Sequence, residues 1–242
     1  MSSLMAARAA RSAGQSDLAV RLARTAHAAE PQEPAALFLL CSLLLEQQDP
    51  EANTLVASLE GFSGFGAGWE ELGETLHWLG SAAAEIAFRR AAEAYAAAEQ
   101  LTESAEIAYR LGVVLRRLGK HAMARDAMQR SVQRDPMAAA AWYNLGLLRQ
   151  DLRDGAGAVE AFGHALAARP DFHEAAFNMG VALQENRDIE AALDAYATAW
   201  RLRPDSFGRI AQALVSSDVG RLWLHPTRLR QDLAARHRIN IA

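Results

Sequence analysis

Apolar and small residues recur along the second half of the chain with a fixed period of 34 residues. Each period holds an apolar-Gly pair, then an alanine, a large apolar residue and a proline. The members are Leu111, Gly112, Ala124, Met128 and Pro136; Leu145, Gly146, Ala158, Phe162 and Pro170; and Met179, Gly180, Ala192, Tyr196 and Pro204. Two antiparallel helices cross closely only where one side chain is small, and a large neighbour fills the adjacent hole. Each period therefore predicts a helix hairpin, and hairpins must stack to bury their apolar faces.

The stretch 139–172 carries the most complete version of this pattern. Trp142, Leu145-Gly146, Ala158, Phe162, Ala165 and Pro170 stand in the order W-x2-L-G, A-x3-F-x2-A, P. This order resembles the tetratricopeptide repeat, a 34-residue helix–turn–helix unit. The resemblance implies an all-α fold, namely a right-handed α-solenoid of about six repeats with a C-terminal capping helix and a short tail.

The same template divides the chain into three parts. Residues 1–65 contain two degenerate helix pairs, and the four glycines of Gly61–Gly68 predict a loop that acts as an irregular or mobile joint. Residues 66–206 contain four repeats, at 66–104, 105–138, 139–172 and 173–206. Residues 207–242 leave the pattern and form a capping helix over 207–215 and a basic tail.

The tail leaves two interpretations open. Its arginines form an exposed docking element, or they only solubilise a segment whose Leu222, Trp223, Leu224 and Leu229 pack on the last repeat. We expect an extended stretch at 221–225 and a final helix over 227–236. The arginines concerned are Arg221, Arg228, Arg230, Arg236 and Arg238.

Composition narrows the function class. The chain has 242 residues, 51% of them hydrophobic, and a net charge of −4, which gives no reason to expect nucleic acid as a partner. No apolar run approaches the roughly 20 residues of a membrane-spanning helix, and the single Cys41 fits a cytoplasmic location.

Cys41 takes a small-residue position, which favours a packing thiol over a nucleophile. Acids such as Glu70 and Glu71 are typical of helix starts and solvated faces. We found no catalytic, metal or cofactor motif, so no enzyme and no cofactor is expected.

The resemblance also implies where a partner would bind. In this family the first helix of each repeat lines a concave groove, and matching positions give an aromatic column, a polar column with two asparagines, and smaller apolar groups. An asparagine side chain can pair with the main chain of an extended peptide without reading its sequence. The alternative is that these residues only support neighbouring repeats. The predicted peptide-binding residues are Tyr109, Arg110, Val113, Arg116, Tyr143, Asn144, Leu147, Gln150, Phe177, Asn178, Val181 and Gln184.

One known use of this scaffold, the carboxylate clamp for acidic chaperone tails, does not match this chain. The clamp positions hold Tyr109, Val113, Asn144, Glu174 and Asn178, and only Asn144 agrees. Because Glu174 would repel a carboxylate, we expect no binding of such tails. A basic spot at Arg110, Arg116 and Arg117 either meets an acidic partner segment or is a solvated face.

The sequence therefore predicts a non-catalytic scaffold or adaptor that binds a peptide segment or protein surface in the groove. Three alternatives stay open: a regulatory protein that responds to a peptide or small molecule through the glycine-rich joint, a binding subunit or chaperone for a larger enzyme or secretion assembly, and self-association through terminal repeats.

Overall fold

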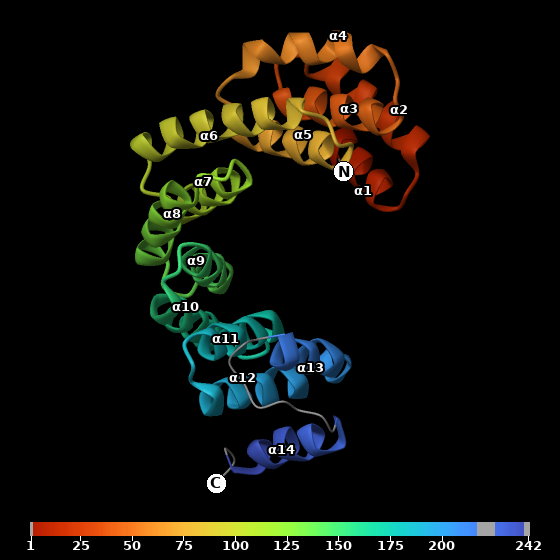
Figure 1. The fold of residues 1–242 in the computed structure, drawn as a ribbon. Coiled ribbons are helices and arrows are strands. Elements are labelled where there is room, and N and C mark those ends of the chain that lie inside the picture. Colours follow the sequence, from red (N-terminus) through yellow and green to blue (C-terminus); the bar gives the residue numbers. More distant parts are fainter. Residues whose placement is uncertain (1, 217–225, 240–242) are drawn as a thin grey trace. The chain divides into compact units, whose positions relative to one another are not determined.

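The computed structural model describes residues 2–216 and 226–239, and these ranges contain helices and turns but no strand. The chain is an all-α solenoid, as predicted, and α1 with α2, α3 with α4, α5 with α6, α9 with α10 and α11 with α12 pack as hairpins (Figure 1). It divides into two compact units, Met1–Lys120 and His121–Ala242. We call them unit 1 and unit 2 and describe each by itself.

Unit 1 contains three helix pairs and one further helix. Its elements are α1 (Ser3–Ser12), α2 (Ser16–Ala29), α3 (Pro34–Glu46), α4 (Glu51–Ser58), the short 3-10 helix η1 (Leu59–Phe62), α5 (Gly66–Trp78), α6 (Ala83–Leu101) and α7 (Ala105–Arg117). Helix α3 is apolar on every side and is buried between α2 and α5, so it forms the centre of the unit. Pro34 opens this helix at its first position, where a backbone N–H has no partner inside the helix.

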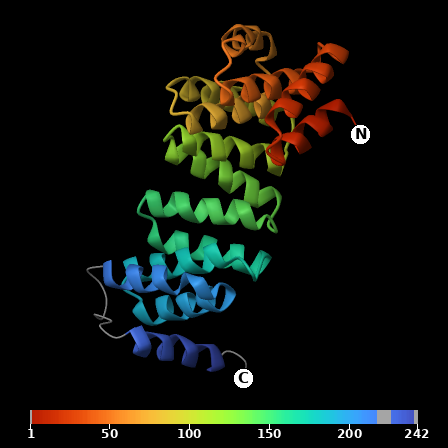
Figure 2. The ribbon, with the colours of Figure 1, turned by 90° about the vertical axis from the view of Figure 1, so that its right-hand side faces the viewer.

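Unit 2 continues with the regular 34-residue period. Its elements are α8 (His121–Arg134), α9 (Ala139–Asp151), α10 (Gly155–Ala168), α11 (His173–Glu185), α12 (Ile189–Leu202), the 3-10 helix η2 (Pro204–Ser206), α13 (Phe207–Ser216) and α14 (Pro226–Ile239). Helices α9 to α12 contact one another in chain order, and they lie in successive layers (Figure 2).

Six turns between helices use a residue in the left-handed region, with φ between 58° and 71°. The six residues are Gly14, Gln48, Gly80, Gly119, Arg153 and Arg187. In unit 2 the following aspartate starts the next helix, because Asp154 accepts a bond from the Gly157 backbone N–H and Asp188 accepts one from Ala191. Residues in the turns and at the helix starts therefore determine where these helices end and begin.

Glycine lies where the two helices of a hairpin come closest, which confirms the packing argument. An added Cβ would lie 2.6 Å from the ring of Phe88 at Gly73, 2.5 Å from Phe162 at Gly146 and 2.7 Å from Tyr196 at Gly180. Real Cβ atoms do not approach that closely, so the glycine and the aromatic ring specify the crossing together.

The expectation of a loop across Gly61–Gly68 is wrong. Residues 61 and 62 end the 3-10 helix η1, and α5 begins at Gly66, so only residues 63–65 are outside helices. Gly68 is buried, and a Cβ there would lie 2.6 Å from the ring of Phe38. The Trp69 indole N–H donates to the Phe62 carbonyl at 3.1 Å. Glycine is needed here for close packing, so this stretch is a packed corner of unit 1.

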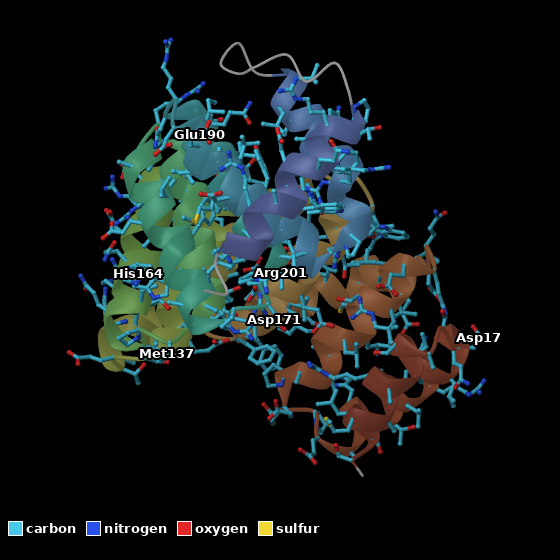
Figure 3. The ribbon with its side chains drawn as sticks, turned by 90° about the horizontal axis from the view of Figure 1, so that it is seen from below. Asp17, Met137, His164, Asp171, Glu190 and Arg201 are labelled. Atoms are coloured by element: carbon cyan, nitrogen blue, oxygen red, sulfur yellow. The ribbon has the colours of Figure 1, made fainter. Side chains whose placement is uncertain are left out.

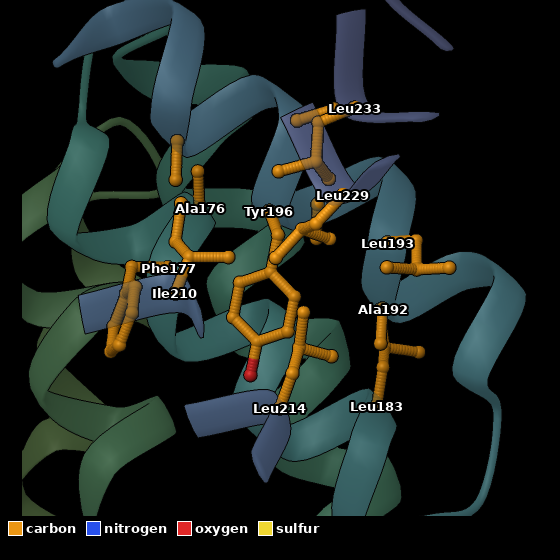
Figure 4. Packing of buried hydrophobic residues seen from close by; sticks show 13 residues of the cluster. Ala176, Phe177, Leu183, Ala192, Leu193, Tyr196, Ile210, Leu214, Leu229 and Leu233 are labelled. Carbon is orange, nitrogen blue, oxygen red and sulfur yellow. The ribbon is translucent and has the colours of Figure 1, made fainter. Parts of the chain in front are cut away.

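The last two helices cover the apolar face of α12. Ile210 and Leu214 of α13 and Leu229 and Leu233 of α14 are buried against Tyr196 and its neighbours (Figure 4). This confirms the capping helix and the packing of Leu229. The expected extended stretch at 221–225, including Arg221, Leu222, Trp223 and Leu224, lies outside the described residues.

Candidate functional site

The twelve predicted binding residues lie on three first helices. Four are on α7 in unit 1, and eight are on α9 and α11 in unit 2. The two groups belong to different units, so we describe them separately.

Asn144 and Asn178 lie on the neighbouring helices α9 and α11, and both are half-buried. Their amide N–H groups are bonded within the chain, since Asn144 donates to the Ala140 carbonyl and Asn178 donates to the Tyr143 hydroxyl, each at 2.9 Å. Gln150 extends the row, with its amide 3.5 Å from a Glu185 carboxylate oxygen. Leu147 and Val181 are partly buried on the same helices. We call these seven residues, Tyr143, Asn144, Leu147, Gln150, Asn178, Val181 and Glu185, the α9–α11 face.

Tyr143 both supports the packing and contributes to this face. Its ring lies 5.9 Å from that of Phe162 and 4.8 Å from that of Phe172, while its hydroxyl accepts the bond from Asn178. The aromatic residue therefore orients the asparagine beside it.

Two predicted binding residues are not accessible. Gln184 is 3% exposed, accepts a bond from the Tyr196 hydroxyl at 2.9 Å and donates to the Ala213 carbonyl at 3.2 Å. Phe177 is 9% exposed, and the Arg209 guanidinium lies 4.5 Å from its ring centre. Both predictions are corrected for one reason: α13 packs beside α11 and uses the positions that an open groove would leave free.

On α7, the predicted basic spot is largely neutralised. Arg110 pairs with Glu106 at 2.6 Å and with Glu70 at 3.2 Å, and Glu70 also accepts a bond from the Tyr95 hydroxyl at 2.6 Å. Arg117 makes a bidentate pair with Glu74 at 2.9 and 3.0 Å. The pairs with Glu70 and Glu74 hold α7 against α5. Arg116 and Tyr109 also have partners within the chain, and Val113 is half-buried.

Burial and the neighbouring charges affect this cluster further. Burial raises the pKa of the Tyr95 hydroxyl, and its bond to the Glu70 carboxylate raises it more, so the hydroxyl stays a donor. For Arg110, desolvation works against the charged form, but Tyr95, Glu70 and Glu106 outweigh it and raise its pKa. The Tyr95 hydroxyl therefore stays neutral and the Arg110 guanidinium stays charged at any ordinary pH.

Unit 1 contains a cavity of about 550 Å³ that is not among the sites predicted from the sequence. It lies along α5, and the lining comes from all four first helices of the unit: Arg8 and Arg11 of α1, Glu46 of α3, Ala67, Glu70, Glu71, Glu74, Thr75 and Trp78 of α5, Arg110 of α7, and Phe65 before α5. We call it the α5 cavity. Glu70 and Glu71 are thus ion-paired cavity residues, which corrects their interpretation as solvated helix-start acids.

A signal for this cavity was present in the sequence. When the repeat template starts at Gly66, its groove positions two, five, six, nine and thirteen are Ala67, Glu70, Glu71, Glu74 and Trp78. All five line the cavity. In the repeat 66–104 the groove positions therefore coincide with the lining of the cavity.

Reactive groups elsewhere are used in packing. Burial raises the pKa of the Cys41 thiol to about 12, so it stays protonated, which agrees with a packing role. Within the described ranges, no three His, Cys, Asp or Glu residues gather as metal ligands would.

Trp142 and His164 stack at 4.3 Å on the protein surface, where Figure 3 labels His164. No helix in the described part of the chain combines the length and the apolar character needed to cross a bilayer.

Glu174, which occupies a clamp position, is kept in its charged form. Desolvation works against this charge, but a bond from its own backbone N–H and the neighbouring His173 and Arg203 lower its pKa overall. A negative group at this position agrees with the expectation that acidic tails are not bound.

Comparison with known proteins identifies the repeat. The family model described as "Tetratricopeptide repeat" matches residues 4–56, 87–139, 109–149 and 143–207. No curated protein sequence matches the chain significantly.

Solved structures share the fold at low identity. PilF of Pseudomonas aeruginosa has a TM-score of 0.55 and 15% identity, over 97% of this chain and 86% of its own. YrrB, described as a protein of this type with an unusual peptide-binding site, has a TM-score of 0.52 and 19% identity, over 76% of this chain and 93% of its own. MamA has a TM-score of 0.50 and 20% identity, over 83% of this chain and 89% of its own. These likenesses concern the fold.

Proposed function

Since this chain belongs to the tetratricopeptide-repeat family, we propose that it is a non-catalytic scaffold or adaptor that binds an extended peptide segment or a protein surface through the first helices of its repeats. The observation that carries this proposal is the pair Asn144 and Asn178. They are half-exposed on adjacent first helices, and their amide nitrogens are already oriented by bonds within the chain. Because each amide nitrogen is held in this way, the side-chain carbonyl oxygen is oriented to accept a hydrogen bond from a partner's backbone N–H.

Preorganisation supports the same function. The Tyr143–Asn178 bond and the contacts of Tyr143 with Phe162 and Phe172 hold the α9–α11 face before any partner arrives. Binding then orders the partner but little of the protein, which favours affinity. The proposal includes the cytoplasmic location, a protein or peptide partner and no nucleic acid. In unit 1 we propose a separate contact surface on α7, made of Tyr109, Arg110, Val113 and Arg116.

The regulatory alternative loses its physical basis. It required a mobile joint at Gly61–Gly68, and this stretch consists mainly of helical turns closed by the Trp69–Phe62 bond. No observation favours it over the adaptor.

The test starts from a random decapeptide library displayed on phage and selected on the full chain. The best peptide is then titrated against Asn144→Ala, Asn178→Ala and a matched control, Asn53→Ala, which changes an exposed helical asparagine in unit 1. A net hydrogen bond is worth about 0.5–1.5 kcal/mol, so each groove variant should bind roughly 2- to 12-fold more weakly, while Asn53→Ala binds normally. Unchanged affinity in both folded groove variants would refute the assignment.

A further inference from the structure

The α5 cavity carries a second inference, which is independent of the α9–α11 face. Its most unusual feature is Trp78, the last residue of α5. This side chain is 77% exposed although it lines a cavity. A large exposed indole at the edge of a cavity is typical of binding surfaces, because it offers wide contact area with few rotatable bonds.

The floor of the cavity is charged and ordered. Arg11 bonds to Glu71 and Glu46 at 2.5 Å each and contacts the Thr75 hydroxyl at 3.4 Å, which joins α1, α3 and α5. At the other side, Glu70 joins α5 to Arg110 of α7. The walls are therefore held in place by ion pairs between residues far apart in the sequence, so the cavity is preformed.

The dimensions fit a short extended segment. From Ala67 to Trp78 the α5 helix rises about 16 Å at 1.5 Å per residue. An extended chain advances about 3.3 Å per residue, so this length corresponds to roughly five residues. The charged walls do not suit an apolar small molecule, because its entry would desolvate the ion pairs without replacing them.

The charge of the unit favours a cationic occupant. Residues 1–120 contain 15 acidic and 10 basic residues, a net charge of −5, whereas residues 121–242 have a net charge of +1. The lining itself has four glutamates and three arginines, although Glu74 is also satisfied by Arg117. Each glutamate has two carboxylate oxygens. Glu70 uses Oε2 for both Tyr95 and Arg110, and Glu46 uses Oε1 for Arg11. Their second oxygens are the acceptors that a further cation would meet.

The indole adds a preference for the same kind of group. A guanidinium or ammonium is attracted to the face of an indole, and at an exposed site this attraction strengthens binding roughly two- to fivefold. We propose that the α5 cavity binds an extended segment of a partner protein by placing an arginine or lysine side chain of that segment against Trp78, with the carboxylates of Glu46 and Glu70 as its counter-charges.

The experiment uses the full chain and three synthetic peptides, acetyl-Gly-Gly-X-Gly-Gly-amide, in which X is arginine, glutamate or norleucine. The indole N–H resonance of Trp78 is followed by NMR and assigned from its loss in Trp78→Leu. We expect the arginine peptide to shift this resonance saturably at millimolar concentration, and the other two peptides to leave it in place.

Variants then separate the cation from plain apolar contact. Saturation-transfer NMR should show arginine-peptide binding roughly two- to fivefold weaker for both Trp78→Ala and Trp78→Leu, because leucine keeps apolar area but lacks the π face. The matched control is Leu101→Ala, which removes an 86% exposed side chain of the same unit and should bind normally.

Several results would overturn the proposal. A stronger shift with the glutamate peptide would identify an anion site centred on Arg8, whose ion pair with Glu71 is 3.6 Å long. Equal shifts with norleucine would indicate unselective apolar contact, and no shift with any peptide would exclude a peptide site. Dimerisation of the chain alone that Trp78→Ala abolishes, seen by sedimentation, would identify a second copy as the occupant.

Discussion

A single methyl group added at Gly146 should destabilise unit 2, and the same group added at Gly163 should stabilise it. Both glycines lie inside helices of one hairpin, so replacement by alanine gains about 1 kcal/mol of helix propensity in each case. At Gly146 the new Cβ would lie 2.5, 2.7 and 2.9 Å from three atoms of the Phe162 ring, which is fully buried and has no room to withdraw. At Gly163 nothing lies within 4 Å of it.

The propensity gain cancels when the two variants are compared, so their difference reports the packing term alone. Overpacking a tight core costs about 1–3 kcal/mol, and the free energy of unfolding should therefore be lower for Gly146→Ala by roughly that amount. With about 3 °C per kcal/mol for a chain of this size, the two melting temperatures should differ by about 6 °C. Circular dichroism at 222 nm, with heat and with urea, measures both quantities.

A double-mutant cycle checks the cause. In a Phe162→Leu background the ring is gone, so Gly146→Ala should destabilise less than in the wild type, with a coupling energy of about 1–2 kcal/mol. If both alanine variants stabilise the protein equally, or if the coupling is absent, the close crossing does not explain the 34-residue pattern.

Two further predictions concern buried polar groups. Tyr196→Phe removes the donor to the buried Gln184 oxygen and should lower the free energy of unfolding by about 1–3 kcal/mol. The loss should be smaller in a Gln184→Leu background, where the acceptor is also absent. Equal losses in both backgrounds would contradict a stabilising role for this bond. Burial raises the pKa of Cys41 from 9.0 to about 12, so at pH 8 the native thiol should react with iodoacetamide about a thousandfold more slowly than in the urea-unfolded chain. The same shift contributes stability that is complete below pH 9 and is lost between about pH 9 and 12, as the unfolded thiol ionises first. Comparable reaction rates would show that Cys41 is accessible.

The hairpins could be predicted because their contacts are short-range and periodic. The spacing of Gly146 and Phe162 records one contact between adjacent helices, and the same spacing recurs at Gly180 and Tyr196. The capping helix followed from the apolar face that the last repeat leaves uncovered. The division into repeats and the ten accessible binding residues stay predictions.

What could not be predicted depends on contacts that the period does not contain. Gly68 supplies close packing rather than flexibility, and composition does not distinguish these uses. Gln184 lies at a groove position by the template, but in the last repeat its neighbour is α13. The α5 cavity depends on pairs such as Arg11 with Glu71, 60 residues apart, although the template positions of α5 already indicated which side chains face it.

The cover that α13 and α14 place over α12 has a consequence for assembly. Repeat arrays elongate when the exposed end of one molecule receives the beginning of another. Here a second molecule would first have to displace Leu229 and Leu233, which are 1% and 0% exposed. Returning each side chain to water costs about 1.5–3 kcal/mol of free energy. Arg236 of α14 also forms ion pairs with Glu190 and Asp194 of α12, which hold α14 against α12. Stacking of a further repeat on α12 would therefore cost about 3–6 kcal/mol before any new contact forms, which works against end-to-end self-association at this helix.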